Sequence, residues 1–388
     1  MAIVKWENNI LGFIPKTDWL DVPFQIQRPN DPADALFGDL KTANLVAEWE
    51  SIAAEYQIPM MAQFHGFDTE SQTTFRLPVD SHNIEKGLIK VKINQSERMR
   101  ALLRSGVQDD SALYNYVVDD GTRLAEQVIT RTKVAKNELL ATGQVTIKEN
   151  NLDLTVDYGV PAAHTSLQLD FTGDVPAQLY QIVEDALAEG TIITGIFTTR
   201  KVIGYLRKDA NIQKAINGNI GAGALVSRSA LENYLAEEFG ITQVITNDLT
   251  YGVGGGIDGT SGRPTVTAKR YYPNDKITFF STNVGGSLGV GLWGDSPEAD
   301  VAQLLNVSNS SVSPYVYITQ WSEEDPAVLW TKASSLFMPV LYNPNSLFVA
   351  DVVTEEESND NAGNDNAGGD NAGGDNAGGD ENANPQGA

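Results

Sequence analysis

Residues Ser111–Thr142, SALYNYVVDDGTRLAEQVITRTKVAKNELLAT, form the stretch that decides the fold of this chain. Apolar side chains recur along it at spacings of 4, 7, 4, 7 and 4, at Leu113, Val117, Leu124, Val128, Ala135 and Leu139. Such spacing places them in one stripe along a helix. Asp109 and Asp110 before the run and Gly143 after it are typical of helix ends. We therefore predict a single helix, about 48 Å long, that packs on a sheet; a coiled-coil dimer is the alternative.

The sequence after this helix predicts a hairpin. In residues 144–158, QVTIKENNLDLTVDY, apolar and polar residues alternate on either side of Glu149-Asn150-Asn151. Alternation with period two is typical of strands, and amide residues between two such runs favour a tight turn. We expect the strands SPYVYITQW (313–321) and SLFVADVV (346–353) to return to the hairpin and the long helix and to complete one domain with them.

Between residues 174 and 283 the pattern changes to helices and strands in alternation. Asp174 is typical of the N-cap of a helix over DVPAQLYQIVEDALAEG. Ser229 and Glu232 form a capping box for SALENYLAEEFG, a helix that stops at Gly240. The runs TIITGIFTT, ITQVITND and KITFFST are typical of strands. We predict a mixed α/β domain that is inserted into the first.

Upstream of the long helix, residues 60–94 are predicted to form two extended segments, of which the second carries positive charge. In GLIKVKIN, Ile89, Val91 and Ile93 share one face while Lys90 and Lys92 share the other. The seven basic residues of this region are Arg76, Lys86, Lys90, Lys92, Arg98, Arg100 and Arg104. Three acidic residues accompany them, although the whole chain carries 51 acidic and 27 basic residues and a net charge of −24. A solvated ribbon face is one interpretation, and a contact with an acidic partner is the other.

The two ends of the chain differ from the body. Residues 1–58 combine scattered Trp and Pro with a patch, TANLVAEWESIAAEY, that we expect to be helical, and they are typical of an arm that lies on other surfaces. Residues 355–388 hold nine acidic residues, no basic residue and a five-residue Asp-Asn-Ala-Gly-Gly period. With nothing larger than Ala to bury in its repeats, this tail is expected to be disordered. A calcium-binding β-roll would need a longer period and an apolar residue in each repeat.

Composition excludes several classes of site. The chain has no cysteine, so disulfides, thiolate metal sites and cysteine nucleophiles are absent. His65, His82 and His164 are dispersed and lack the spacing of metal ligands. No run approaches the ~18–20 apolar residues of a membrane span, and no signal peptide is visible. We expect a soluble protein made in the cytoplasm, with no metal and no cofactor.

Two glycine motifs lack the context that catalysis requires. Gly254, Gly256 and Gly259 match a dinucleotide-binding pattern, but β-like sequence follows them, so a loop is predicted. Residues 285–289, GGSLG, match a hydrolase elbow, but no helix and no histidine follow Ser287. We therefore predict no catalytic residue.

The order of the elements resembles that of tailed-phage major capsid proteins with the Hong Kong 97-type fold, and more closely the lambda head-protein group, phage capsid protein E. Residues 271–300, YYPNDKITFFSTNVGGSLGVGLWGDSPEAD, resemble the Pro-Asx-Asx strand, Gly-rich turn and Gly-x-x-Pro-Glu-Ala segment of that group. Residues 325–353, DPAVLWTKASSLFMPVLYNPNSLFVADVV, resemble its closing segment. The stretch FRLPVDSHNIEKGLIKVKINQSERM resembles the junction before the long helix in capsid proteins of phages of Gram-positive bacteria. Together these cover residues 55–354.

The resemblance implies an α+β fold and a name for each part. Residues 1–58 would be the N-arm, and residues 59–95 the E-loop, which lies over a neighbouring subunit. The peripheral (P) domain would comprise 96–174 and 306–354 with the spine helix 111–142. The axial (A) domain would be 175–305, and the acidic tail 355–388 lies outside the family pattern.

The function implied is that of a major capsid protein, without enzymatic activity, which assembles through pentamers and hexamers into an icosahedral shell around double-stranded DNA. The implied partners are further copies of the chain, a separate scaffolding protein and a portal protein, with a decoration protein as a further candidate. Assembly would take place in the cytoplasm of the bacterial host. A secreted or surface-displayed binding protein with an acidic tail, and an α/β hydrolase, are the alternatives.

The resemblance also favours the partner interpretation of the positive charge. We then expect Arg76, Lys86, Ile89, Lys90, Val91, Lys92, Ile93, Arg98, Arg100 and Arg104 to form an intersubunit contact. Its apolar face would pack on a neighbour, and its lysines would pair with acidic residues there.

Overall fold

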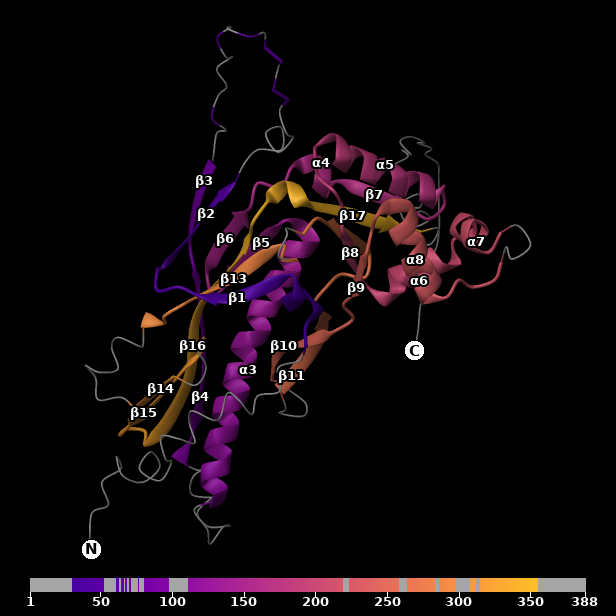
Figure 1. The fold of residues 1–388 in the computed structure, drawn as a ribbon. Coiled ribbons are helices and arrows are strands. Elements are labelled where there is room, and N and C mark those ends of the chain that lie inside the picture. Colours follow the sequence, from indigo (N-terminus) through magenta and orange to yellow (C-terminus); the bar gives the residue numbers. More distant parts are fainter. Residues whose placement is uncertain are drawn as a thin grey trace, which may run out of the picture.

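The computed structural model describes residues 30–51, 61–62, 64–65, 67, 70, 76, 80–97, 111–218, 223–257, 264–282, 286–297, 308–311 and 315–354. Figure 1 shows the long helix α3 running beside one sheet, with an α/β part at its C-terminal end. The helices of the described part are α3 (Ser111–Thr142), α4 (Ala162–Thr165), α5 (Val175–Ala188), α6 (Arg200–Lys208), α7 (Ala210–Asn217) and α8 (Arg228–Phe239), with short 3₁₀ turns η2 (Pro32–Ala35) and η5 (Pro344–Ser346).

The prediction of one helix over 111–142 is confirmed, because α3 has these bounds. Leu124, Val128 and Leu139 of the apolar stripe are buried. The helix ends at Gly143, whose φ of +71° is strained for residues other than glycine. From Leu124 onward the stripe therefore packs within the subunit, on a sheet.

That sheet has six strands, in the order β1-β13-β16-β15-β14, with β4 paired to β16 as well. Its strands are β1 (Phe37–Lys41), β4 (Gly87–Gln95), β13 (Gly289–Gly294), β14 (Ser308–Ser311), β15 (Tyr317–Glu323) and β16 (Val328–Leu341). The central strand β16 is long enough to pair with β15 near its start and with β13 near its end. Phe337 and Ala333 of β16 share a core with the α3 stripe.

A second, five-stranded sheet has the order β7-β17-β12-β8-β9. Its strands are β7 (Leu167–Asp170), β8 (Gly195–Thr198), β9 (Gln243–Thr246), β12 (Lys276–Phe280) and β17 (Leu347–Val353). Ile277 and Phe279 pack in one core with α5–α8, and Phe280 packs in the core that contains α3. Thr278 Oγ1 also donates a hydrogen bond to the carbonyl oxygen of Leu140 at 2.7 Å. Burial on both faces explains why KITFF is apolar without strict alternation.

The start of α5 is as predicted, but that of α8 is not. Asp174 caps α5 through its side chain, which accepts a hydrogen bond from the Ala177 amide. The N-cap of α8 is Ser227, which accepts from the Ala230 amide, so Ser229 lies inside the helix and the predicted capping box is wrong. The helix starts at Arg228, and its N-cap lies two residues before the predicted one.

Three two-stranded ribbons complete the described structure. The predicted hairpin is confirmed as β5 (Gln144–Glu149) and β6 (Leu152–Asp157), and its turn residues Asn150 and Asn151 have φ values of 50° and 64°. Positive φ at both positions is the geometry of a type I′ turn. The other ribbons pair β2 (Val46–Ser51) with β3 (Asp80–Glu85) and β10 (Thr250–Ile257) with β11 (Pro264–Arg270).

The structure corrects the predictions for the N-terminal region. The expected helical patch at 42–56 is wrong where it is described, because strand β2 occupies 46–51 and pairs with β3. Residues 31–41 are part of the subunit, since Ala33 and Phe37 are fully buried and β1 pairs with β13. Residues 1–29 lie outside the described residues.

Two strands lie in sheets other than those expected. Strand β17, expected beside the hairpin, pairs with β12 and β7 in the second sheet. Strand β4, expected in a projecting ribbon with residues 60–78, pairs with β16 instead. The glycine run at 252–256, predicted to be a loop, lies in β10, with a register shift between Gly254 and Ile257.

Candidate assembly surface

Strand β4 places the predicted contact residues on the two faces of the six-stranded sheet. It runs antiparallel to β16, with Val91 opposite Ala333 and Ile89 opposite Ser335. Ile89 and Val91 pack against the core that includes the α3 stripe. The expectation that this apolar face packs on a neighbour is therefore wrong for these two residues, because α3 of the same subunit covers it. Ile93 is 37% exposed.

The outer face of the sheet carries lysines and tryptophans from three strands. Lys92 of β4 lies directly opposite Lys332 of β16, and Trp330 lies opposite Trp321 of β15. The Lys92 ammonium nitrogen is 4.3 Å from the centroid of the Trp330 ring, and that of Lys332 is 5.7 Å from the Trp321 ring. The two indole rings stack with centroids 6.0 Å apart. We call Lys92, Lys332, Trp321 and Trp330 the lysine–tryptophan face.

Alternation along the strands explains this arrangement. Residues 90, 92 and 94 of β4 and residues 330, 332 and 334 of β16 point to the same side because successive side chains alternate. Lys90 and Lys92 are both exposed on that side. The sequence predicted the separation of lysines from isoleucines correctly. It did not predict the tryptophans beside them, because the pairing of β4 with β16 joins residues that are far apart in the chain.

Lys86 does not belong to this surface. Lys86 is 2% exposed. Its ammonium group donates hydrogen bonds to the Thr42 hydroxyl at 2.6 Å and to the Trp293 carbonyl oxygen at 3.3 Å. The carbonyl oxygens of Thr42 and Asn44 accept two further hydrogen bonds. Burial lowers the pKa of Lys86 from its ordinary value. The predicted intersubunit role of Lys86 is corrected to an internal one, in which it fixes the chain between β1 and β2.

The remaining predicted contact residues are placed only in part. Arg76 is exposed. Arg98, Arg100 and Arg104 lie outside the described residues. The structure thus brings Lys90, Lys92 and Ile93 to one strand and, of the other predicted residues that it describes, places Lys86 inside the subunit.

A second charged cluster lies beside the lysine–tryptophan face and was missed by the sequence analysis. Lys41 Nζ is 2.6 Å from Asp295 Oδ1, which also accepts a hydrogen bond from the Tyr317 hydroxyl at 3.3 Å. The hydrogen bond from Lys41 is the largest cause of a lowered pKa for Asp295. These residues come from β1, the end of β13 and β15, so the cluster ties together strands that are distant in sequence.

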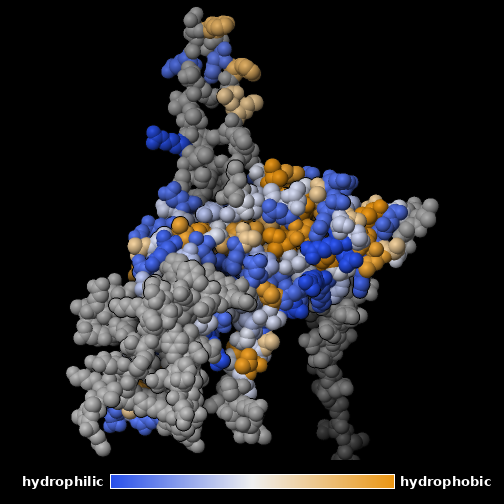
Figure 2. Space-filling view, turned by 60° about the horizontal axis from the view of Figure 1, so that its bottom comes forward, coloured by the Kyte–Doolittle hydropathy of each residue, from blue (hydrophilic) through white to orange (hydrophobic). Residues whose placement is uncertain are grey.

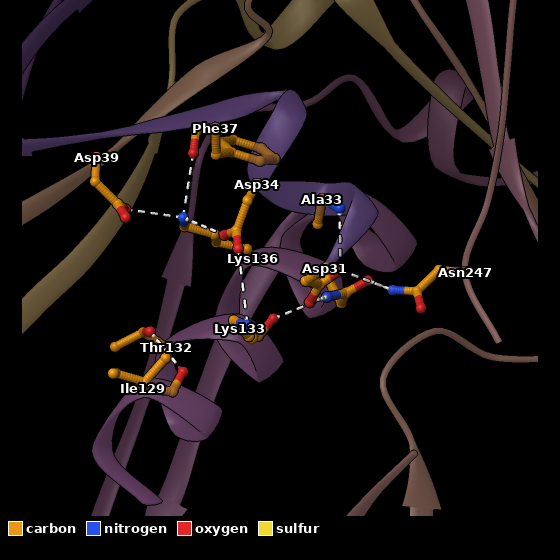
Figure 3. A network of polar contacts seen from close by, with 11 residues as sticks. Asp31, Ala33, Asp34, Phe37, Asp39, Ile129, Thr132, Lys133, Lys136 and Asn247 are labelled. Carbon is orange, nitrogen blue, oxygen red and sulfur yellow. Dashed lines mark hydrogen bonds and ion pairs between the residues drawn. The ribbon is translucent and has the colours of Figure 1, made fainter. Parts of the chain in front are cut away.

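A polar network anchors the N-terminal segment to α3 (Figure 3). Lys136 is only 1% exposed. Its Nζ lies 2.8 Å from Asp34 Oδ1 and 2.9 Å from Asp39 Oδ1. It also donates to the Phe37 carbonyl oxygen at 3.1 Å. Lys133 Nζ lies 3.9 Å from Asp34 Oδ2. A charge this deep is tolerated because several oxygens surround it.

Asp31 extends the network to the α/β part. Its Oδ2 accepts a hydrogen bond from Asn137 Nδ2 at 2.9 Å, and its Oδ1 accepts from Asn247 Nδ2 at 3.0 Å. Asn247 also donates to Asn137 Oδ1 at 2.8 Å. Burial raises the pKa of Asp31 from its ordinary value. The network therefore holds together three separate parts of the chain, at Asp31, Asn137 and Asn247.

The rejected chemical motifs have no catalytic geometry in the described residues. Strand β13 starts at Gly289, so no helix follows Ser287. No group of three His, Asp or Glu side chains in the described part of the chain could hold a metal ion. None of the helices described combines the length and the hydropathy that a membrane crossing requires.

The sequence profile of the phage major capsid protein E family matches residues 87–352. This range starts at β4 and ends in β17, and it includes α3, the five-stranded sheet up to Val352, the lysine–tryptophan face and every strand of the six-stranded sheet except β1. The chain belongs to the phage major capsid protein E family. It is a structural, shell-forming protein of the phage capsid, as the resemblance implied.

Several solved structures are similar over most of the chain. The capsid protein of a prophage from E. coli CFT073 has 13% identity and a TM-score of 0.49, with 89% of this chain and 99% of that chain covered. A phage-related protein from Bordetella bronchiseptica RB50 has 9% identity and a TM-score of 0.48, with 86% and 96% covered. The capsid of cyanophage A-1(L) has 13% identity and a TM-score of 0.45, with 83% and 92% covered. No curated protein sequence matches the chain.

Proposed function

We propose that this capsid protein builds its shell through pentamers and hexamers in which one subunit covers the exposed apolar residues between β2 and β3 of the next. Met61, Phe64 and Phe67 lie in this stretch, with exposed fractions of 89%, 106% and 101%. The coloured residues of the stretch stand away from both sheets in Figure 1. These three side chains carry the proposal, because burying each one fully would stabilise an assembly by ~1.5–3 kcal/mol.

Other exposed apolar side chains support contacts between subunits. Leu152, Ile192 and Val266 are 60%, 65% and 68% exposed, on β6, after α5 and on β11. In Figure 2 hydrophobic residues gather in patches across the middle of the molecule. Exposed apolar patches mark interaction surfaces when they are extensive. In a closed symmetric shell, the same contact with a neighbour would cover these patches on every subunit.

Lys90 and Lys92 supply an electrostatic contact in this proposal. Each subunit is acidic, with a net charge of −24, so a neighbour presents carboxylates to these exposed lysines. A single exposed ion pair contributes only ~0–1 kcal/mol. The contact becomes significant because symmetry repeats it in every subunit of a shell.

The remaining features of the proposed function follow from the family resemblance. The resemblance assigns residues 1–58 to an N-arm, 59–95 to an E-loop, 96–174 and 306–354 to a P-domain and 175–305 to an A-domain. Because residues 31–41 and strand β4 belong to the six-stranded sheet and its core, we propose an arm or loop that lies over a neighbour only for the other residues of the first two ranges. The shell encloses double-stranded DNA without sequence-specific binding and without catalysis. Its assembly in the host cytoplasm uses a separate scaffolding protein, a portal protein and, as a further candidate partner, a decoration protein.

Paired substitutions test the apolar contact. Because Phe64 and Phe67 are already exposed in the subunit, Phe64→Ser with Phe67→Ser should leave its unfolding curve unchanged. The same variant should lose the ability to form shells when it is co-expressed with its scaffolding protein and examined by electron microscopy. Glu70→Gln in the same stretch is the matched control and should form normal shells. Normal shells from the double variant would contradict the proposed contact.

A further inference from the structure

A cavity in the α/β part combines apolar walls with two acidic residues. It has a volume of about 340 Å³ and lies between α4, the C-terminal half of α5 and β17. The residues that decide its chemistry are the apolar Leu167, Ile182 and Phe348 and the polar His164, Asp185 and Glu189. The polar residues do not form a group that could hold a metal ion. A ligand of this cavity must therefore suit both an apolar wall and two carboxylates.

A buried histidine fixes one of the two carboxylates. His164 is 3% exposed, and its ring stacks on that of Phe348 with centroids 3.9 Å apart. Its Nε2 lies 2.7 Å from Glu189 Oε2, and Nε2 donates this hydrogen bond because a carboxylate can only accept. Neither Glu189 nor Asp185 contacts a lysine or an arginine of the described residues. An incoming basic side chain would supply such a partner.

A lysine side chain has the matching shape and charge. Its aliphatic stem can pack against the apolar walls while its ammonium group remains at the acidic residues. The ammonium group carries three donors and no acceptor, so it can donate to Asp185 and Glu189 at once.

The α6–α7 corner, residues 200–217, carries lysines that are available for this contact. It contains five basic residues and one acidic residue, in a chain whose net charge is −24. Arg200, Lys201 and Arg207 contact other residues of the subunit. Lys208 and Lys214 are exposed, and their ammonium groups contact no acidic residue that the structure describes. We propose that the cavity binds the α6–α7 corner of a second copy of the chain, through Lys208 or Lys214.

The corner and the cavity lie at opposite ends of α5, so they do not meet within one subunit. Asn211 of α7 donates a hydrogen bond to Asp174 Oδ1 at the N-terminus of α5, at 3.3 Å, whereas Glu189 follows its C-terminus. A helix of 14 residues is ~21 Å long. Figure 1 accordingly shows α5 between α4 and α7.

A contact between two different surfaces of the same chain joins subunits head to tail. Repeating such a contact by one rotation closes a ring, and every subunit then offers one corner and one cavity. This inference rests on the proposed function, because pentamers and hexamers are rings of this kind. A basic segment of a scaffolding protein is the competing occupant. The corner is favoured because the chain itself supplies one for each cavity.

Carbodiimide cross-linking tests the inference, because the reagent joins a lysine directly to a carboxylate. Shells assembled from a mixture of ¹⁴N- and ¹⁵N-labelled full-length protein would be treated with it and analysed by mass spectrometry. We expect mixed-isotope peptides that join Lys208 or Lys214 to Asp185 or Glu189. A link between Lys148 and Asp153, whose Nζ and Oδ1 atoms lie 3.9 Å apart on the β5–β6 hairpin, should carry a single isotope and is the control.

Charge exchange tests the same contact without a reagent. Lys208→Glu with Lys214→Glu should lower the yield of shells, and so should Asp185→Lys, because each change brings like charges together. All three substitutions combined restore opposite charges and should recover part of the lost yield. Glu184, the preceding residue of α5, is exposed but does not line the cavity. As the matched control, Glu184→Lys should assemble normally and should not rescue the variant of the two lysines.

Intact shells in which neither lysine is joined to Asp185 or Glu189 would overturn the contact. Links of a single isotope, links of the cavity to a scaffolding protein alone, or a rescue by Glu184→Lys equal to that by Asp185→Lys would overturn it as well. These results would leave the contact of Phe64 and Phe67 standing, since that contact is tested by shell formation itself. Wild-type protein that forms no shells would overturn the proposed function, and this inference with it.

Discussion

Lys136 Nζ lies 2.8 Å from Asp34 Oδ1, across 102 positions of the sequence. This ion pair joins the N-terminal segment to the long helix within the core of the subunit. The same ammonium group also contacts Asp39 and the Phe37 carbonyl oxygen, so it closes η2 and β1 onto α3. A segment expected to be an arm on other surfaces is thereby part of the subunit from residue 31 onward.

Removal of this ammonium group should destabilise the subunit. Lys136→Met leaves Asp34 and Asp39 without their shared cation, and breaking a buried pair costs ~3–5 kcal/mol. The side chains of Asp34 and Asp39 are 37% and 26% exposed, so water compensates in part and we expect a loss of ~2–3 kcal/mol. Urea unfolding of unassembled subunits measures it. Lys148→Met on the exposed hairpin is the control, with a change within ~0.5 kcal/mol; equal effects of the two substitutions would contradict the assignment.

Asp31 should give the subunit a dependence on pH. Burial raises its pKa in the folded state, so the folded protein holds this proton more tightly than the unfolded chain. The free energy of unfolding contributed by Asp31 therefore falls as pH rises from about 4 through the raised pKa. Asp31→Asn lacks this contribution, so the free energy of unfolding of the wild type should fall relative to that of the variant as pH rises. A difference that is constant from acidic to neutral pH would show that Asp31 does not titrate in this way.

Charge reversal on β4 should impair assembly but not folding. Lys90→Glu with Lys92→Glu removes the cation over Trp330, which contributes ~0.5–1 kcal/mol at an exposed site. The circular dichroism spectrum and cooperative unfolding should be retained, while the yield of shells falls. The loss of yield should become smaller when a second subunit variant presents new cations to the two glutamates, and this rescue should be strongest in low salt. Lys148→Glu on the hairpin should assemble normally. Wild-type yields of shells from the β4 variant would refute the electrostatic contact.

The close approach of Phe280 to Gly195 predicts a compensating pair of substitutions. A Cβ atom at Gly195 would clash with the Phe280 ring, so Gly195→Ala should overpack the second sheet and cost ~1–3 kcal/mol. Adding Phe280→Leu relieves the contact with the Phe280 ring, while the 2.9 Å approach to Gln243 Cβ remains, so the double variant should be more stable than the sum of the two single effects predicts. Thermal unfolding of the four proteins measures this coupling, and simple additivity would count against it.

Sequence periodicity predicted the elements whose pattern is local. The stripe of α3 and the alternation of β5 and β6 need no partner to be recognised, and both were predicted correctly. The helical patch at 42–56 was wrong because helix-forming residues outweighed a period-two pattern, in which Ala47 and Trp49 face inward in β2. Here pairing with β3 overrides intrinsic helix propensity.

The candidate surface was predictable only in part, because its residues come from distant strands. The opposite faces of isoleucines and lysines on β4 follow from alternation alone. Whether α3 or a neighbour covers Ile89 and Val91 depends on the pairing of β4 with β16, about 240 positions away, which no local pattern encodes. The partners of Asp31, at Asn137 and Asn247, are separated from it by 106 and 216 positions and are hidden for the same reason.

Electron microscopy of the purified full-length protein, alone and co-expressed with its scaffolding protein, tests the central claim most directly. We expect rings of subunits and closed icosahedral shells. Persistent monomers, with no rings or shells under any condition, would contradict it.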